Sequence, residues 1–294
     1  MTAAAHAEPV PRSRGVPRAV RRKRLLVAIA DHSLLIAAAI AFVAPVVFVL
    51  LTSLMTNGQA LSDRLWPSPF RWENYVDVFS DAPLWRWALN SFVYASLATI
   101  GLLLSSIPVA YAFACLRWRG RDAAFMVVLV ALMLPPQVTV VPLYVMWAKL
   151  GLVGGLWPLI VPNWFGAAFA IFLLRQFFLT IPTEYLDAAR VDGCGELRVL
   201  TRVVVRMGKP AIAAVALFSV LYTWNDYFLP LLYLSENPDN WVTSIGLSQF
   251  RSLHQVQWNL TMAATVLVML PVVVVFFLAQ KAFVEGVTLT GVKG

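Results

Sequence analysis

Long runs of apolar residues, interrupted by short polar segments, make up most of this sequence. An α-helix needs about 20 residues to cross the roughly 30 Å hydrocarbon core of a bilayer, and several of the runs are that long. A segment inside the bilayer must satisfy its own backbone hydrogen bonds, which favours helices. The runs predict six transmembrane helices, at about residues 34–54, 89–115, 123–141, 157–178, 211–234 and 262–282. The pattern therefore predicts an all-α, polytopic membrane protein.

The composition supports this class and distinguishes a polar amino-terminal tail from the apolar remainder of the chain. Charged residues make up only 13% of the sequence, whereas a soluble domain carries about 25%. Residues 1–24 are rich in Ala, Pro and Arg, which predicts a disordered basic tail; residues 25–294 are expected to form one transmembrane domain. A cleaved signal peptide is an alternative, because Ala37 to Ala39 are small. The apolar run continues to Leu54, however, which is too long for a signal peptide.

The positive charges indicate the orientation of the spans. Five of the 23 Lys and Arg residues fall in segments assigned to the outside, and the rest fall inside. The five are Arg64, Arg71, Arg86, Lys149 and Arg251. Basic residues concentrate on the cytoplasmic side of membrane proteins, so both termini and residues 182–210 are predicted to be cytoplasmic. The net charge of +8 is therefore explained by topology, and we expect no nucleic-acid partner.

The longest polar stretch, residues 182–210, separates two strongly apolar blocks. Thr183 is a candidate N-cap for a first short helix. Asp192 and Gly193 then provide a turn, because glycine accepts backbone angles that other residues avoid. A second helix is expected from Gly195 to Met207. A helix–turn–helix between two spans is suited to docking into a partner in the aqueous phase.

Within this stretch, Asp187-Ala188-Ala189 followed three residues later by Gly193 resembles the EAA loop of permease subunits of binding-protein-dependent ABC importers. In that family the loop forms a coupling helix, which sits in a cleft of a cytoplasmic ATPase. The resemblance implies a set of residues that couple transport to the ATPase: Glu184, Asp187, Ala188, Ala189, Asp192 and Gly193. An ordinary solvated loop is the alternative interpretation.

Two positions depart from the family pattern. Asp187 replaces the usual glutamate, which keeps the charge but shortens its reach. Arg206 stands where the family has a proline, although Pro210 matches a second proline that is common there. These departures place the strength of coupling in question.

Further stretches resemble the sugar-importer branch of the same permeases: Met133–Tyr144 (MLPPQVTVVPLY), Thr223–Pro230 (TWNDYFLP) and Phe283–Gly294 (FVEGVTLTGVKG). The last resembles the second permease subunit of maltose-type and glycerol-phosphate-type systems. The resemblance implies a bacterial plasma (inner) membrane protein that works with a second, non-identical permease, an ATPase dimer and an extracytoplasmic solute-binding protein. It also implies alternating access for a sugar or sugar-like solute.

The sequence contains no motif for chemistry of its own. It lacks the G-x-x-x-x-G-K-[ST] loop that cradles phosphates, so ATP and Mg are expected to be used by the partner ATPase. Cys115 and Cys194 have no metal-binding or redox spacing, and the three histidines are scattered. We therefore expect this chain to bind no cofactor or metal and not to be an enzyme.

Four polar residues in or beside the apolar runs are candidates for the translocation path: Asn225, Asp226, Gln137 and Asn163. An ionisable residue within a span is by default a functional hypothesis. For Asp226 the alternatives are a structural cap near Pro230 or a position at the outer interface. Two other functions also stay open: a secondary transporter driven by an ion gradient, which would depend on Asp226, and an ABC permease for another solute class.

Overall fold

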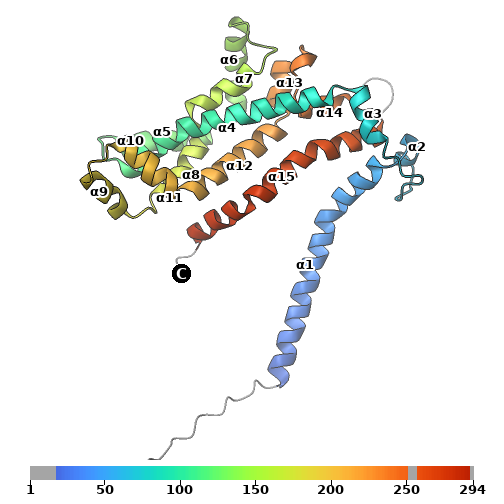
Figure 1. Cartoon of the computed structure of the whole chain (residues 1–294), viewed down its shortest axis with the longest axis horizontal. Helices are drawn as coiled ribbons and strands as arrows, with labels where there is room; N and C mark the ends of the chain where they lie inside the picture. Colours follow the sequence, from blue (N-terminus) through green and yellow to red (C-terminus); the bar gives the residue numbers. More distant parts are fainter. Residues whose placement is uncertain (1–17, 251–256, 292–294) are drawn as a thin grey trace, which may run out of the picture. The chain divides into compact units, whose positions relative to one another are not determined.

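The computed structural model describes residues 18–250 and 257–291 of the chain (Figure 1). Within these ranges the regular structure is entirely helical, as the apolar pattern predicts. The α-helices are α1 (Arg18–Ser53), α2 (Asn57–Ala60), α3 (Asn74–Asp81), α4 (Leu84–Cys115), α5 (Arg121–Met133), α6 (Pro136–Lys149), α7 (Trp157–Ile160), α8 (Ala168–Phe178), α9 (Thr183–Val191), α10 (Glu196–Val199), α11 (Val205–Met207), α12 (Lys209–Asn225), α13 (Phe228–Leu234), α14 (Thr243–Gln249) and α15 (Trp258–Gly291). Two 3₁₀ segments, η1 (Val161–Phe165) and η3 (Pro238–Asn240), and one π-helical segment, η2 (Leu200–Val204), complete the described structure.

Among the described residues, four helical segments are long and apolar enough to cross a membrane, namely Ile29–Ser53, Leu84–Cys115, Trp157–Phe178 and Trp258–Leu278. Two bent helix pairs also pass the test when each is counted as one span, which gives up to six. The bends measure 91° between α5 and α6, and 79° between Glu196–Met207 and α12. The predicted class, an all-α polytopic membrane protein, is confirmed. The count of six spans stays a prediction.

The third predicted span, residues 123–141, is not one straight helix. α5 ends at Met133, and both Leu134 and Pro135 adopt extended backbone angles before α6 begins at Pro136. Two consecutive prolines explain this break, because proline lacks a backbone N–H and disfavours helical geometry in the residue before it. The sequence therefore contains the cause of the break within this predicted span.

The fifth predicted span, residues 211–234, is also interrupted. α12 ends at Asn225, Asp226 is extended, and α13 starts at Phe228. The helix at the end of the chain, by contrast, runs to Gly291 and passes the predicted limit at residue 282. At the other end, residues 18–24, predicted to belong to the disordered tail, form the first turns of α1, and residues 1–17 lie outside the described ranges.

The chain divides into two compact units, residues 1–49 and 50–294. The described part of the first unit is residues 18–49 of α1, whose side chains from Ile29 to Phe48 are exposed within this chain. Because most of these side chains are apolar, we expect lipid or another subunit to cover them. The second unit holds the candidate site.

The second unit is a bundle arranged around α4. α4 contacts α8 and α12, and α12 also contacts α15, so these helices lie side by side in Figure 1. Small residues allow this close approach: Ala98 and Ala110 of α4 and Ala263 and Ala264 of α15 are fully buried. Gly101 of α4 lies directly against the Trp164 side chain, where an added Cβ would come within 2.2 Å of the ring. Figure 1 places α9 to α11 at one end of this bundle and α3 at the opposite end.

Candidate functional site

The polar stretch folds as the predicted helix–turn–helix. α9 covers Thr183–Val191, and the second helix runs from Glu196 to Met207 through a π-helical segment. Thr183, however, is the first residue of α9 and not its cap; Pro182 holds the cap position, and no side chain caps the helix. The Thr183 side chain lines a cavity instead, so the predicted cap was wrong.

Gly193 ends α9 in the predicted turn. Its φ of +79° lies in the left-handed region that favours glycine. The Gly193 N–H donates to the Arg190 carbonyl at 3.0 Å, and the Cys194 N–H donates to the Ala189 carbonyl at 3.0 Å. These bonds satisfy helix-end carbonyls in the manner of a glycine C-terminal cap. The turn is therefore built from local signals that the sequence contains.

α9 has one inward side chain and a mixed outward face. Leu186 is 3% exposed and belongs to the same buried cluster as Phe178, Val199 and Val204. Ala189 packs partly against that cluster. The other five predicted coupling residues are exposed: Glu184, Asp187, Ala188, Asp192 and Gly193.

Three large apolar side chains of the same segment are also exposed. Val191 is 87% exposed, Leu197 is 74% exposed and Tyr185 is 56% exposed. They share this segment with the exposed carboxylates of Glu184 and Asp187. An exposed apolar surface bordered by charges is typical of a protein–protein contact.

Sequence reasoning missed a polar network behind this face. Arg190 donates from Nη1 to Asp187 Oδ1 at 3.0 Å, from Nε to Glu196 Oε1 at 3.0 Å and from Nη2 to Glu196 Oε2 at 3.3 Å. The two bonds to Glu196 form the fork that a guanidinium makes with a carboxylate. Glu196 Oε2 also accepts a hydrogen bond from the hydroxyl of Tyr111 on α4. No spacing in the sequence indicates this, because Tyr111 lies in a distant apolar run.

The network sets the charge state of Glu196. The hydrogen bond from Arg190, followed by the one from Tyr111, lowers the pKa of the Glu196 carboxyl below its usual value. The same bond to Glu196 is the main cause of the raised pKa of Arg190. Both partners are therefore held in their charged forms.

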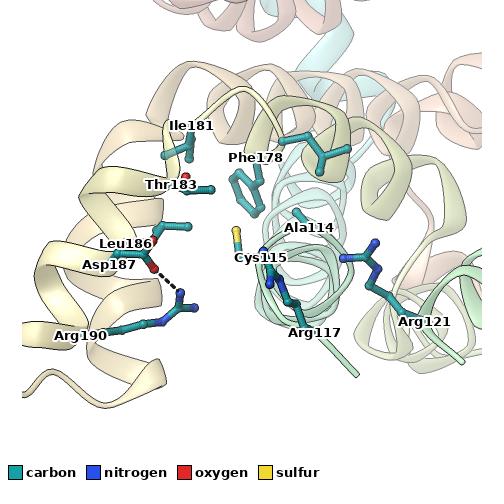
Figure 2. A pocket seen from close by; sticks show the side chains of 11 residues that line it. Ala114, Cys115, Arg117, Arg121, Phe178, Ile181, Thr183, Leu186, Asp187 and Arg190 are labelled. Carbon is teal, nitrogen blue, oxygen red and sulfur yellow. Dashed lines mark hydrogen bonds and ion pairs between the residues drawn. The ribbon is translucent and has the colours of Figure 1, made fainter. Parts of the chain in front are cut away.

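A cavity of about 660 Å³ separates α9 from the end of α4 (Figure 2). Asp187 and Arg190 line it from α9, and Cys115 and Arg117 line it from the α4 side. The other lining residues are Ala114, Arg121, Phe178, Leu179, Ile181, Thr183 and Leu186. Figure 2 shows the Arg190 and Arg117 side chains directed toward the same space.

Of the predicted path residues, Asn163 lines a second cavity, of about 460 Å³. This cavity is mostly apolar and is lined from α4, η1, α8 and α12 and from the residue before α8: Leu102, Asn163, Ala167, Phe169, Ala170, Val215, Phe218, Ser219 and Tyr222. The Asn163 side chain donates from Nδ2 to the Leu159 carbonyl at 2.9 Å. Sequence reasoning missed Phe218 and Tyr222, which lie on a helix of nearly uniform apolar character.

The other three predicted path residues do not line either cavity. Asp226 joins helices at the break between α12 and α13: its carboxylate accepts from the Tyr94 hydroxyl at 3.1 Å and from the Leu229 N–H at 3.3 Å. Asn225 is exposed and donates to the Leu221 carbonyl at 2.7 Å. Gln137 is exposed in the first turn of α6. The bonds of Asp226 match the capping alternative.

Within the described ranges, no three or more His, Cys, Asp or Glu side chains gather in a way that could hold a metal ion. Cys115 and Cys194 are free thiols.

These features define a helical membrane protein with a charged helix–turn–helix at one end of its bundle. The chain belongs to the family of binding-protein-dependent transport system inner membrane components, whose profile matches residues 106–289. The arabinooligosaccharides transport system permease protein AraQ of Halalkalibacterium halodurans is 34% identical over 244 residues, which cover 83% of this chain and 86% of that protein.

A second relative and a solved structure extend the comparison. The sn-glycerol-3-phosphate transport system permease protein UgpE of Yersinia pestis bv. Antiqua is 36% identical over 229 residues, covering 76% of this chain and 81% of that protein. The fold is similar to that of a chain in the crystal structure of a bacterial ABC transporter involved in the import of the acidic polysaccharide alginate. The TM-score is 0.79 at 22% identity, covering 92% of this chain and 100% of that chain.

Proposed function

We propose that this chain is one of two non-identical permease subunits of an ATP-driven importer for a sugar or sugar-like solute. Its family is binding-protein-dependent, which supports delivery of the solute by an extracytoplasmic binding protein. The named solutes of its relatives, arabino-oligosaccharides and glycerol 3-phosphate, support the carbohydrate class. ATP and Mg²⁺ are used by a partner ATPase dimer, and this chain is not itself an enzyme.

The observation that carries the proposal is the outward face of α9 and α10. Val191, Leu197 and Tyr185 are large and exposed, beside the carboxylates of Glu184 and Asp187. In the proposed assembly this face enters a cleft of the ATPase, which covers the apolar side chains. Ala188 permits close approach because it is small, and the turn at Asp192 and Gly193 fixes the direction of the chain.

The proposed topology has six spans in the bacterial inner membrane with both termini in the cytoplasm. It counts the bent pair of α5 with α6 as one span and takes the sixth span from the pair that contains α12. Residues 182–210, which we call the coupling segment, lie outside the bilayer in this topology. The excess of basic residues in the segments assigned to the inside supports this orientation. The coupling segment then faces the aqueous phase that contains ATP.

The cavity lined by Asn163 is the proposed contribution of this chain to the translocation path. Phe218 and Tyr222 present aromatic surface to the same space as the Asn163 side chain. A sugar ring has apolar faces and hydroxyl edges, and such a lining matches both. Asn225, Asp226 and Gln137 stay predictions as path residues.

The test is gentle detergent extraction of the tagged chain, followed by mass spectrometry of what co-purifies. We expect an ATPase and a second permease of different sequence, with the untagged chain as the background control. The purified assembly, in proteoliposomes with its binding protein, is then offered arabino-oligosaccharides, glycerol 3-phosphate and alginate oligosaccharides. A chain that purifies alone and moves solute on a proton or sodium gradient would contradict the proposal and favour secondary transport.

A further inference from the structure

The coupling segment is tied to α4 by side chains that the family pattern does not include. Arg190 on α9 and Glu196 on α10 form the forked ion pair, and Tyr111 on α4 donates to the same carboxylate. We call these three residues the coupling strut. The strut crosses from one short helix of the turn to the other, and then to a helix that runs the length of the bundle.

The cavity beside the strut determines how a movement of α9 can reach α4. The cavity of about 660 Å³ lies between α9 and the end of α4, so their direct packing is confined to one side, where Leu186 and Tyr111 belong to the same buried cluster. Side chains on opposite walls of the cavity are not in contact, so a movement of α9 reaches α4 through the groups that join the two walls. The apolar contact of Leu186 with the core lies on one side, and the strut supplies a directional polar bridge beside it.

The ion pair of the strut is too exposed to contribute much to the stability of the fold. The Arg190 side chain is 33% exposed and the Glu196 side chain is 48% exposed. Exposed ion pairs contribute little to stability because water and salt screen them. A forked pair nevertheless fixes the mutual orientation of its partners. The main effect of the pair is therefore to fix the orientation of α9 relative to α10.

α4 connects the strut to the proposed path. Leu102 of α4 lines the 460 Å³ cavity, and Tyr111 stands further along the same helix. At 1.5 Å per residue the two positions are roughly 14 Å apart. A displacement of the α4 end at Tyr111 is thus carried to the cavity wall by a continuous helix.

We propose that Glu196 is a positioning residue that joins the coupling helix α9 to α4, through Arg190 on one side and Tyr111 on the other. Through this joint, movement of α9 on closure of the ATPase displaces the inner end of α4. This inference rests on the proposed function. It assigns to Glu196, Arg190 and Tyr111 the transmission of the α9 movement to α4.

Replacing Glu196 or Tyr111 by a residue of similar shape should remove specific hydrogen bonds of the strut. Glu196 Oε1 accepts from Nε of Arg190, whereas Oε2 is shared by Nη2 of Arg190 and the Tyr111 hydroxyl. A glutamine at this position has one acceptor oxygen, so it loses one side of the fork or the Tyr111 bond. Tyr111→Phe removes the hydroxyl alone and leaves the ring in place.

The experiment compares hydrogen–deuterium exchange of the assembled transporter at rest and after trapping with ATP and vanadate. In the wild type we expect trapping to change exchange both in residues 183–196 and in residues 111–117. In Glu196→Gln and in Tyr111→Phe the change in 183–196 persists, and the change in 111–117 is lost. Glu73→Gln is the matched control, since its ion pair with Arg71 is exposed and lies beside α3, at the opposite end of the bundle.

A variant in which the two charged residues of the strut are exchanged provides a second test if a single variant folds poorly. Arg190→Glu combined with Glu196→Arg restores the ion pair and leaves an arginine facing the Tyr111 oxygen, and it should recover the response in 111–117. An unchanged response in both single variants would overturn the strut and leave the proposed function intact. Equal disturbance of 111–117 at rest and after trapping would show a merely structural role. A wild-type chain that binds no ATPase would overturn both proposals.

Discussion

The carboxylate of Glu196 is held in its charged form by the guanidinium of Arg190. That hydrogen bond is the largest cause of its lowered pKa, and the bond from Tyr111 adds to it, against a smaller opposing effect of burial. A carboxyl whose pKa is lower in the folded state stabilises the fold above its unfolded pKa. The stabilisation is small here, because both partners are partly exposed.

The pH dependence of this contribution follows from its sign. The ordinary pKa of the Glu196 carboxyl is 4.5, and its folded value lies lower. The difference in melting temperature between the wild type and Glu196→Gln should therefore be constant from neutral pH down to that ordinary value. It should vanish as the pH falls through the folded pKa. Thermal unfolding of the detergent-purified chain over this range measures it, and a difference that shrinks already near neutral pH would contradict the lowered pKa.

At the scale of elements, Gly208 forms the elbow between the coupling segment and α12. Its φ of −81° is ordinary, so it is not glycine for conformational reasons. A Cβ at this position would lie 2.7 Å from Phe178 Cε1 and 2.8 Å from the Val204 carbonyl oxygen. Phe178 is 1% exposed, so neither neighbour moves without disturbing the packing around it.

Gly208→Ala should therefore destabilise the chain by about 1–3 kcal/mol, the usual cost of overpacking. Gly58→Ala is the control, because an added Cβ there meets no atom within 4 Å. Thermal or denaturant unfolding in detergent compares the two. Equal stabilities would mean that the elbow can open without strain.

Local signals predicted the elements that local chemistry decides. Asp192 and Gly193 define the turn within the coupling segment, and the helices on either side followed from it. The bend of 91° between α5 and α6 begins at the adjacent prolines, but its angle depends on packing that no local signal contains. At the break, Asp226 accepts a hydrogen bond from Tyr94, which belongs to another helix and is not indicated by any local signal.

The candidate site divides in the same way. The motif contains Asp187 and Ala188, which are exposed on α9, because the family pattern lies along the sequence, but it leaves out the exposed Tyr185 and Val191. The strut was missed, because Tyr111 comes from an apolar run in which no spacing marks one hydroxyl. Asn163 was found as a rare polar residue, whereas Phe218 and Tyr222 were hidden by the uniform apolarity of α12. Tertiary packing decides which of its faces lines the cavity.

At the scale of the whole molecule, the proposed assembly separates the surface that would contact the ATPase from the cavity that would contact the solute. The coupling segment lies at one end of the bundle in Figure 1, and the cavity lined by Asn163 is bounded by α4, η1, α8 and α12. In that assembly, helices that extend from the coupling segment to the cavity transmit the motion between them. α4 and α12 are placed for this, because both pack at the centre of the bundle.

A single exposed alanine tests this division. Ala188 is exposed on α9 and contributes nothing to the buried cluster, so Ala188→Arg should leave the fold and membrane insertion unchanged. In the proposed assembly the larger, charged side chain prevents close approach of the ATPase. Loss of a well-packed contact costs about 2 kcal/mol or more at the centre of an interface, which corresponds to more than about a tenfold loss of affinity.

The measurement is the affinity of purified ATPase for the chain in nanodiscs, together with the yield of the second permease. We expect the ATPase affinity to fall and the permease pairing to stay, because the substitution lies only on the outward face of the coupling segment. Asp63→Arg is the matched control: it introduces the same side chain at an exposed position between α2 and α3. If both variants bind the ATPase as the wild type does, the outward face of α9 is not the docking surface, and the exposed Val191 and Leu197 need another partner.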